Sequence, residues 1–403
     1  MIPSISVLSW RTFSFARQTV VVRAAIFVVL VMSLFYGWFQ ALPRETRVLM
    51  LSESVTASCK PNETLYTDEA SCATRHDRAP IPNIAHFVYI LSDPDNGTFP
   101  FKFSHLISVY GAWRRWQPDV LYLHTNVAAS SSAVLQARAG EQGKWAQRLF
   151  NMPGLVINTI SAPTHTNRGQ ELKHMEHRSD FVRVKVVHDF GGVYMDMDVH
   201  ALRDMRPLRE AGYKAVAGRQ GGGLLNSGTF LAAKGSKATR MWTERMHEVY
   251  DGRWTTHSNE ALTTLGEDLK MYPCEMLMLD QAAFAPIGWK WFDSERLFGE
   301  HYTATSLDQL KKGAGPVEGR PDGSDNAAGL FESKLPWAHD WSCTFLLHAF
   351  SRQKPKLSTK DHDISPRYIA ERRSLYARAV YPILRDMYIN GVIDQSDLEI
   401  ESE

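Results

Sequence analysis

Two carboxylates, Asp196 and Asp198, stand at the end of the apolar run GGVYMDMD, which begins at Gly191. Neighbouring carboxylates repel each other and are costly to bury without a counter-charge. A divalent cation with oxygen ligands supplies that charge, and bound Mg²⁺ or Mn²⁺ keeps coordination positions open for phosphate oxygens. The pair therefore predicts a metal–diphosphate site. The competing interpretation of so short a pattern is a solvated acidic turn.

The elements around this pair can be predicted from periodicity. Val182, Val186 and Phe190 recur at helical spacing, and the two glycines that follow are expected to end the helix. Beyond them the period changes to two, which predicts a strand. Its alternation would place four side chains on one face: Tyr194, Asp196, Asp198 and His200.

Asp180 and Arg183 lie three positions apart on the predicted helix, so they share one helical surface. Arginine offers a permanent charge and a planar fork of donors, which suits a phosphate or a sugar hydroxyl. The alternative is an ordinary ion pair on a helix surface, which contributes little stability by itself.

These residues also carry a family resemblance. Ser179-Asp180-x-x-Arg183, followed by GGVYxDxD, resembles the "SDxxR…GGxYxDxD" signature of family 32 glycosyltransferases, fungal-type Golgi enzymes, and of the related DXD sugar-binding region. The resemblance covers roughly residues 80–350. It implies a GT-A fold, a Rossmann-like mixed sheet flanked by helices that binds a nucleotide sugar through Mn²⁺ (or Mg²⁺). It further implies retention of anomeric configuration, with catalytic roles for Asp180, Arg183, Asp196 and Asp198, the last two holding the metal.

Further residues are assigned to the nucleotide sugar through the same resemblance. Val88 and Tyr89 end the strand IPNIAHFVYI, which resembles the family's opening strand, and would pack on the nucleotide base; the alternative is that both are core residues. Asn226 and Ser227 follow three glycines and resemble the family's "N-[SG]" segment, although a plain glycine-rich turn is the alternative. Tyr194, within the central signature, completes the set. The segment HSNE, beginning at His257, stands where many members have "TGP", which leaves the acceptor side undetermined.

His348 ends the apolar run TFLL, and "LLHAF" resembles the closing segment of the family. Two carboxylates and diphosphate oxygens leave room in an octahedral shell, and a neutral imidazole is an acceptable ligand for Mn²⁺. His348 is therefore a candidate third metal ligand. The alternative is a histidine that caps a buried strand.

The N-terminal region predicts a membrane anchor. Residues 1–23 carry three arginines and no acid, and residues 24–42 form an uncharged run long enough to span a bilayer. Arginines on the N-terminal side favour a single-pass type II protein with residues 1–23 in the cytosol, and a Golgi location is inferred from the resemblance. The alternative, a cleaved signal peptide, fits less well because the run is long and no small-x-small site follows it.

Residues 43–80 lack periodicity and read as a stem. The N-glycosylation candidates are Asn62 and Asn96, both in N-x-[ST] sequons. The four cysteines fall in two separated pairs, Cys59/Cys72 and Cys274/Cys343, which are plausible disulfides in an oxidising lumen although spacing does not fix connectivity.

Alternating short apolar runs and helical segments between residues 81 and 350 predict an α/β domain with βαβ units. The strands are expected at 81–90, 120–124, 155–160, 215–217, 229–233 and 277–280, and the helices at 103–116 and 236–250. Asp280 is expected as a surface acid at a strand end, and residues 311–330 as a mobile loop. Residues 351–403 predict a helical extension with one long amphipathic helix from Pro366, kinked at Pro382.

The sequence as a whole indicates a lumenal enzyme that moves a hexose from a nucleotide sugar to a glycan or glycolipid. A net charge of +1 gives no indication of a nucleic-acid partner. One alternative is a non-catalytic lumenal metal- or carbohydrate-binding protein. A phosphoaspartyl hydrolase, the other alternative, usually carries Thr or Val two positions after the second Asp, where this chain has His200, and carries the motif near the start of its domain. The donor sugar, the acceptor and the oligomeric state are not encoded in any pattern recognised here.

Overall fold

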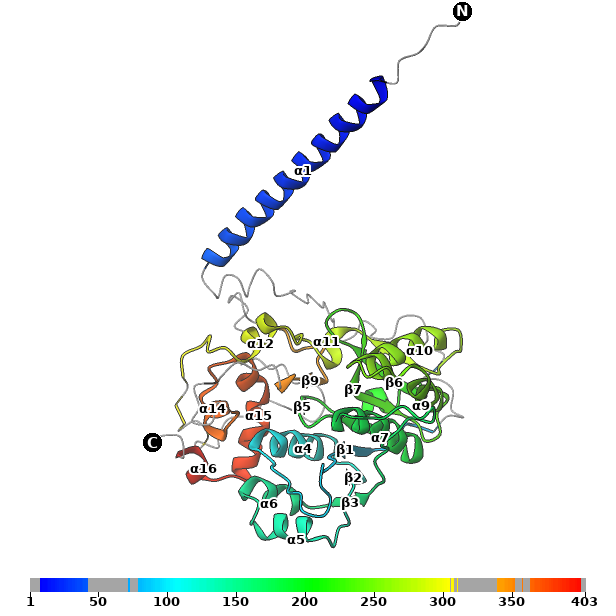
Figure 1. Ribbon diagram of the computed structural model, residues 1–403. Helices are drawn as coiled ribbons and strands as arrows, with labels where there is room; N and C mark the ends of the chain where they lie inside the picture. The colour runs from blue at the N-terminus through cyan, green and yellow to red at the C-terminus, as the bar shows by residue number, and fades with distance from the viewer. Residues whose placement is uncertain are drawn as a thin grey trace, which may run out of the picture. The chain divides into compact units, whose positions relative to one another are not determined.

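The computed structural model describes residues 8–42, 72, 79–304, 306–307, 310, 339–351, 357 and 363–399. The chain divides into two units, residues 1–53 and residues 54–403. The described part of the first unit forms the helix α1 (Leu8–Ala41), whose stretch Val22–Ala41 has a mean hydropathy of 1.9 and is long and apolar enough to cross a membrane (Figure 1). The orientation of this helix in a membrane stays a prediction, as do the boundaries proposed for the tail, stem and extension.

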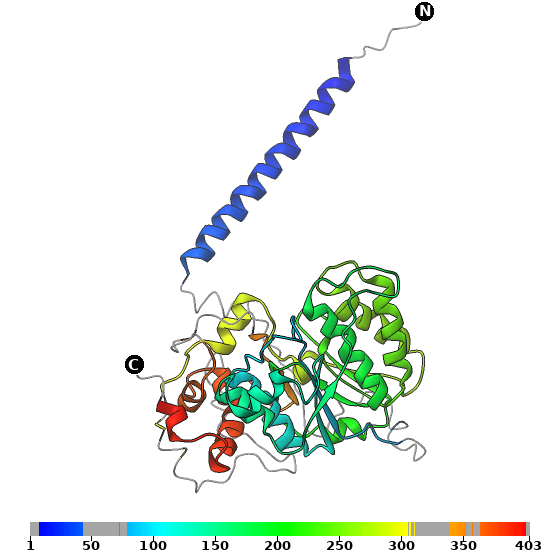
Figure 2. The ribbon, with the colours of Figure 1, turned by 60° about the horizontal axis from the view of Figure 1, so that its bottom comes forward.

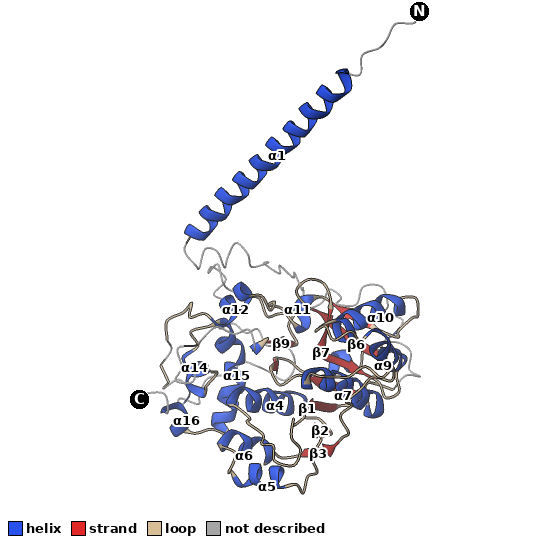
Figure 3. Ribbon diagram, in the orientation of Figure 1, coloured by secondary structure: helices blue, strands red, loops and turns tan. Residues whose placement is uncertain are grey.

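The second unit is built on a seven-stranded mixed sheet with the order β3-β2-β1-β4-β7-β6-β8. Figure 3 shows its strands in red among the blue helices. Strands β3, β2, β1 and β4 run parallel, β7 is antiparallel to both β4 and β6, and β8 is parallel to β6. The strands are β1 (Ile84–Val88), β2 (Val120–Thr125), β3 (Leu155–Thr159), β4 (Gly192–Met195), β6 (Ala215–Arg219), β7 (Leu225–Ala232) and β8 (Leu277–Leu279). This arrangement, with helices on both faces, confirms the predicted α/β fold class.

Helices cover the sheet in two groups. Helices α7 (Met175–Phe190), α9 (Lys237–Val249) and α10 (Ala261–Leu269) pack on one face of the sheet. Helix α4 (Phe103–Trp116) packs on the other face, and α6 (Lys144–Phe150) and α15 (Leu375–Ile389) pack against α4. Figure 2 shows the green group apart from the cyan and red group. The alternation of β4 serves both cores: Val193 and Met195 join the α4 side, and Tyr194 joins the α7 side. The remaining helices are α5 (Ser132–Ala139), α8 (Arg206–Arg209), η1 (Thr256–Glu260), α11 (Gln281–Phe284), α12 (Trp291–Phe298), α14 (Pro366–Glu371) and α16 (Gln395–Glu399).

The strand expected to carry both carboxylates is shorter than the alternation suggested. Strand β4 ends at Met195, residues 196–198 form a turn closed by the Val199 N–H donating to the Asp196 carbonyl (3.0 Å), and β5 (Val199–Ala201) then begins. Strand β5 leaves the main sheet and pairs with β9 (Leu346–His348) in a separate two-stranded sheet. The single alternating strand is therefore a wrong prediction, because the period of two continues through a turn that breaks the ladder.

The C-terminal extension also differs from the prediction. Instead of one long helix, α14 ends at Arg372, which adopts a positive φ of 53°, and α15 begins after a new N-cap at Ser374. The predicted Ser365 cap is confirmed: its side chain accepts a hydrogen bond from the Tyr368 N–H. Pro382 lies within α15, as expected. Asp280 is the N-cap of α11, so it supports a helix end.

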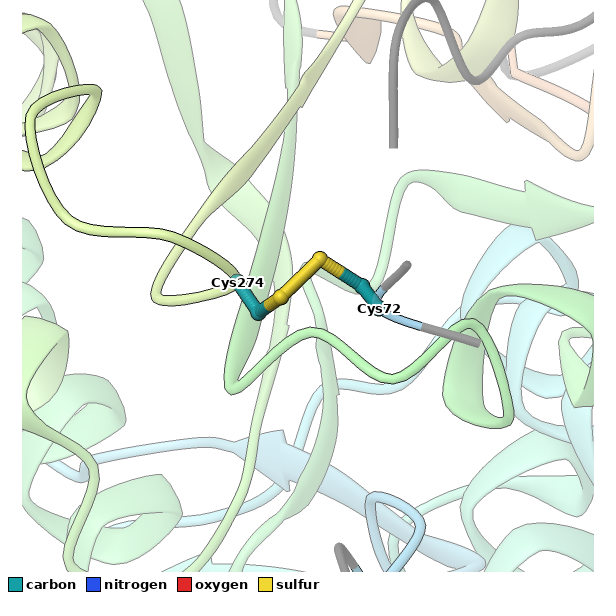
Figure 4. The surroundings of a disulfide bond; sticks show 2 residues. All are labelled: Cys72 and Cys274. Carbon is teal, nitrogen blue, oxygen red and sulfur yellow. A yellow bond between two sulfur atoms is a disulfide. The ribbon is translucent and has the colours of Figure 1, made fainter. Parts of the chain in front are cut away.

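The disulfide prediction is corrected. Cys72 is bonded to Cys274, with a Cα–Cα distance of 5.7 Å, across 202 positions of sequence (Figure 4). The proposed pairings joined cysteines by their order along the chain, but the turn before β8 lies beside the segment that precedes β1. Cys343 is also disulfide-bonded. Cys59, the sequon at Asn62 and the expected loop at 311–330 lie outside the described residues.

Candidate functional site

The candidate site lies at the carboxyl ends of β1 and β4, where a ligand is expected in an open α/β sheet. His86 of β1 pairs with Tyr194 of β4 in parallel register, so Val88 and Asp196, each two positions further, lie at the same level. Gly191 is the C-cap of α7 and Gly192 begins β4, and their φ values are 71° and 119°. A Cβ on Gly192 would lie 2.5 Å from the Ile84 carbonyl oxygen, so only glycine allows β4 to approach β1 this closely.

The turn at 196–198 brings the two carboxylates to one place. The Asp196 N–H donates to the Gly228 carbonyl of β7 (2.8 Å), which anchors the turn to the sheet. The Ser351 N–H donates to Asp198 Oδ2 (2.9 Å), which orients the second carboxylate. Both side chains are partly exposed, at 26%. The turn therefore achieves the juxtaposition that strand alternation was expected to give.

His348 reaches the same place from a distant part of the chain. Strand β9 pairs antiparallel with β5, and Val199 faces His348 in that register. One ligand atom from each of Asp196, Asp198 and His348 lies within 4.8 Å of the others. His348 Nε2 is 3.4 Å from Asp198 Oδ1, and its ring stacks on Phe350 at 3.9 Å between centroids. Two carboxylates suit Mn²⁺ or Mg²⁺, and an imidazole is an acceptable further ligand for Mn²⁺.

The hydrogen bonds of His348 place a condition on its role as a ligand. The Gly228 N–H donates to Asn226 Oδ1 (2.7 Å), so the Asn226 amide nitrogen faces His348 Nδ1 (2.8 Å) and donates to it. A neutral ring with an accepting Nδ1 carries its proton on Nε2, which points at Asp198. Nε2 would ligate a metal only in the other tautomer, with Nδ1–H facing the amide oxygen of a rotated Asn226. The carboxylates fit a metal directly, and the imidazole fits after this rearrangement.

A second group of charges adjoins the first. Arg183 of α7 lies 2.8 Å from Asp180 Oδ1 and 3.3 Å from Asp196 Oδ1, and it donates to the Ser227 carbonyl (3.1 Å). The Tyr194 hydroxyl donates to Asp196 Oδ1 (2.5 Å), and the guanidinium lies 4.9 Å from the Tyr194 ring centroid. Arg183 thus links Asp180 on α7 to the turn at 196–198, so the pair of Asp180 and Arg183 is not a simple surface ion pair.

The pKa values of the site residues reflect burial together with the charges of their neighbours. Burial raises the pKa of Asp196, and the neighbouring Asp198 adds to this, although Arg183 opposes it. Burial acts the same way on Asp198, but His348 and the Ser351 N–H outweigh it and hold the pKa of Asp198 below its usual range. Burial opposes the charge on Arg183, yet Asp180 and Asp196 raise the pKa of the guanidinium.

Asn226 and Ser227 lie inside strand β7, whereas the sequence suggested that they precede it. Both residues are buried. The Asn226 side chain bonds to His348, and the Ser227 carbonyl accepts a hydrogen bond from Arg183. Gly228 was not singled out from the sequence. A Cβ at this position would lie 2.5 Å from Asp196 Oδ2 and 2.8 Å from His348 Cε1, so the site requires glycine there.

The residues predicted to border the nucleotide base pack mainly in the core. Val88 is buried in the α7 core, and the half-buried Tyr89 packs edge-on against Phe101 at 4.7 Å between centroids. Both are therefore core residues by their contacts, and a role toward a nucleotide base stays a prediction. Sequence reasoning gave no role to His257, whose Nε2 lies 2.8 Å from Asp180 Oδ2. The only sequence signal was the departure from the family's "TGP".

Comparisons with known proteins agree with the resemblance at the level of the central region. Residues 104–214 match the family model described as "Glycosyltransferase sugar-binding region containing DXD motif". A search of curated proteins gives no match. Among solved structures, the PaToxG glycosyltransferase aligns with a TM-score of 0.36 and 13% identity over 50% of this chain and 74% of its own.

The glycosyltransferase GlyE of Streptococcus pneumoniae TIGR4 aligns with a TM-score of 0.37 and 12% identity over 78% of this chain. The chain spans 65% of the length of GlyE. The family match covers Asp180, Arg183, Asp196 and Asp198 together. These four residues therefore lie in a region similar to the sugar-binding region of DXD glycosyltransferases.

Proposed function

We propose that this chain is a metal-dependent glycosyltransferase of the family 32 type, which moves a hexose from a nucleotide sugar to a glycan or glycolipid with retention. The observation that carries the proposal is the convergence of Asp196, Asp198 and His348 within 4.8 Å, inside and beside the region that matches a DXD sugar-binding model. Three carboxylates, those of Asp180, Asp196 and Asp198, are gathered around the single guanidinium of Arg183. Such a centre is suited to a divalent cation.

The residues of the site divide into two tasks. Asp196 and Asp198, with His348 in its Nδ1–H tautomer, would hold Mn²⁺ or Mg²⁺, which supplies positive charge for the diphosphate leaving group. Asp180 and Arg183 would contact the donor sugar and phosphate, with Asn226 and Ser227 bordering the sugar and Tyr194 holding Asp196. Val88 and Tyr89 would border the nucleotide base. The rigid bonds of Arg183 to three groups support its role as a fixed charge.

The decisive experiment is a donor panel scored for released nucleotide. The full-length protein is incubated in detergent with Mn²⁺ and with UDP-galactose, UDP-N-acetylglucosamine or GDP-mannose. We expect slow hydrolysis of one donor, which EDTA abolishes. Release of free sugar of unchanged anomeric configuration, followed by NMR, would support retention. Binding of a nucleotide sugar without any turnover would instead indicate the non-catalytic binding protein.

The membrane topology is a separate proposal. Helix α1 would anchor the protein in the Golgi membrane with residues 54–403 in the lumen, and the Cys72–Cys274 bond agrees with an oxidising compartment. Asn96 is exposed on a turn, where its side chain bonds to Asp93 (3.2 Å), so a glycan could attach there. Protease treatment of intact microsomes followed by endoglycosidase tests this. A protease-sensitive domain without a mobility shift on deglycosylation would contradict the topology.

A further inference from the structure

The segment that departs from the family signature forms an unusual element. Residues Thr256–Glu260 form the π-helical turn η1, in which the Glu260 N–H donates to the Thr255 carbonyl (3.0 Å), and α10 follows without a break. Single π-helical turns are rare and are frequently found at functional sites. The wider turn changes which side chains point at α7 and at β7. Its contacts to those two elements show what it positions.

The first contact is between His257 and Asp180. His257 is fully buried, and its Nε2–H donates to Asp180 Oδ2 (2.8 Å), while Arg183 occupies Asp180 Oδ1 (2.8 Å). Among the described residues, His257 Nδ1 has no hydrogen-bond partner. The bond to Asp180 is thus the one directional contact of this ring. Packing holds the ring in place, since it stacks on Phe181 at 5.7 Å with an interplanar angle of 11°.

The second contact is between Asn259 and β7. The Ser227 hydroxyl donates to Asn259 Oδ1 (2.8 Å), and the Ser227 carbonyl accepts from Arg183 (3.1 Å). Four residues on, Thr263 of α10 bonds to the Asn259 carbonyl (2.6 Å) and accepts from the Leu225 N–H (2.8 Å). The turn η1 therefore joins α7 and β7 on either side of Arg183.

We propose that His257 is a positioning residue for the donor sugar: it fixes the plane of the Asp180 carboxylate through the bond that η1 makes possible. This inference rests on the proposed function. An ionised carboxylate offers about four lone-pair sites. Arg183 and His257 each occupy one, on different oxygens, so the remaining sites point in fixed directions and accept sugar hydroxyls. Without His257 the carboxylate turns about its Cβ–Cγ bond and loses that alignment.

A neighbouring histidine separates positioning from packing. His177 is equally buried and lies in the same aromatic cluster, 4.6 Å from His257 between ring centroids. Its Nδ1 bonds to the Tyr250 hydroxyl (3.0 Å). Replacing His177 removes a buried hydrogen bond of similar kind in the same surroundings. It leaves the bond between His257 and Asp180 in place.

The test compares His257→Phe, His257→Gln and His177→Phe in the full-length protein, with the nucleotide sugar that the wild type hydrolyses fastest in the donor panel. Phenylalanine keeps the ring but removes the donor, and the Gln amide nitrogen stands close to the position of Nε2. We expect His257→Phe to lower kcat/KM about 10- to 100-fold, which is the usual effect of losing a hydrogen bond to a charged group. His257→Gln should recover most of this, and His177→Phe should remain within about twofold of the wild type.

Two further measurements exclude a general loss of structure. The inhibition constant of the corresponding free nucleoside, which carries neither the transferred sugar nor the phosphates proposed to contact Asp180, should be unchanged in all three variants. The Tm values of His257→Phe and His177→Phe should fall by similar amounts. Unchanged kcat/KM in His257→Phe, or equal losses in His257→Phe and His257→Gln, would overturn the inference while leaving the proposed function intact. A wild type that hydrolyses no donor would overturn both.

Discussion

Two clusters of charged side chains, one at the site and one at the C terminus, are built from similar groups but differ in the ratio of carboxylates to cations. In the C-terminal cluster, Asp397 of α16 lies between Lys144 and Arg148 of α6, each 2.6 Å from a different carboxylate oxygen, and the Asp397 side chain is only 1% exposed. In the site cluster, Asp180 and Asp196 share the guanidinium of Arg183, while Asp198 lies 3.4 Å from His348 Nε2 and accepts from the Ser351 N–H. One cluster has more cations than carboxylates, and the other has more carboxylates than cations.

This difference separates a structural ion pair from a candidate metal site. A buried carboxylate with a cation at each oxygen contributes to holding two helices together, and removing it leaves charges without a partner. Carboxylates in excess raise one another's pKa and gain from a further cation. Burial is the main cause of the raised pKa of Asp196 and the neighbouring Asp198 adds to it, so a further cation near this pair would stabilise the charged form. The comparison predicts that neutralising a carboxylate affects activity in one cluster and stability in the other.

The largest effect is expected for Asp198→Asn. The substitution keeps the volume but removes one of the two carboxylates proposed to hold the metal, so transfer should fall about 1000-fold or more. The Tm should fall only slightly: an amide oxygen can still accept from the Ser351 N–H, and relief of the repulsion from Asp196 offsets part of the lost attraction to His348. Initial rates with the preferred donor, together with calorimetry, check both parts. Near-wild-type turnover with unchanged sensitivity to EDTA would remove the basis of the proposed site.

A third cluster, formed by the neutral side chains of His86, His124 and Asn158, makes the stability of the protein depend on pH. The Asn158 amide donates to His124 Nδ1 (2.9 Å), His124 Nε2 faces His86 Nδ1 (2.9 Å), and His86 Nε2 donates to the Gly191 carbonyl (2.8 Å). Every ring nitrogen is used when both histidines are neutral. Burial lowers the pKa of His86 to about 4 and that of His124 to about 2. An added proton therefore opposes the folded state.

The sign of the pH effect follows from linkage. Both pKa values are lower in the folded than in the unfolded chain, so the unfolded chain binds more protons below pH 6.5. The stability contributed by the neutral rings is present above pH 6.5 and is lost as the pH falls toward 4, by about 3 kcal/mol for His86 alone. The fall in Tm between pH 6.5 and pH 4.5 should be smaller in the double variant, His86→Gln with His124→Gln, than in the wild type. Equal falls would show that other groups dominate acid unfolding.

Asp397→Asn should lower stability and leave catalysis unchanged. The substitution removes a buried charge and leaves Lys144 and Arg148 facing each other, although both are partly exposed and are screened by solvent. A loss of about 2 kcal/mol is expected. The free energy of unfolding in urea measures this, and kcat per folded molecule should match the wild type. A large loss of kcat at full folding would show that the extension contributes to the site.

The sequence predicted those parts of the molecule that local patterns determine. Helix α4 agrees with its expected residues, 103–116, and the strands at 120–124 and 155–160 are displaced by at most one residue at an end. Apolar periodicity and turn residues determine these elements locally. The Asp196–Asp198 pair could be singled out because both residues stand in one short motif, although a turn brings them together where an alternating strand was expected. His348 was a candidate only through the resemblance, since its approach depends on the pairing of β5 with β9.

Other features depend on contacts between distant segments, which no local pattern contains. The bond between Cys72 and Cys274 joins residues 202 positions apart, and His257 meets Asp180 across 77 positions. The break of the strand at Asp196 is a further example. Alternation of side chains continues through a tight turn, so hydropathy alone does not distinguish one long strand from two short ones. Comparison with the family signature marked the segment HSNE, which begins at His257, as a departure, but it did not give the role of His257.

The smallest effect, and the one that divides the two interpretations of His348, is expected from His348→Ala. As a metal ligand, His348 would supply one of several donor atoms, so its loss should raise the Mn²⁺ concentration for half-maximal activity about tenfold, with a small change in Tm. Ligation requires Nδ1–H, and in the structure Asn226 donates to Nδ1. The Asn226→Asp variant accepts a hydrogen bond at either oxygen, so it should favour the Nδ1–H tautomer and lower the Mn²⁺ requirement. If His348 only caps a buried strand, His348→Ala would lower the Tm by several degrees at an unchanged Mn²⁺ requirement, and Asn226→Asp would not change that requirement either.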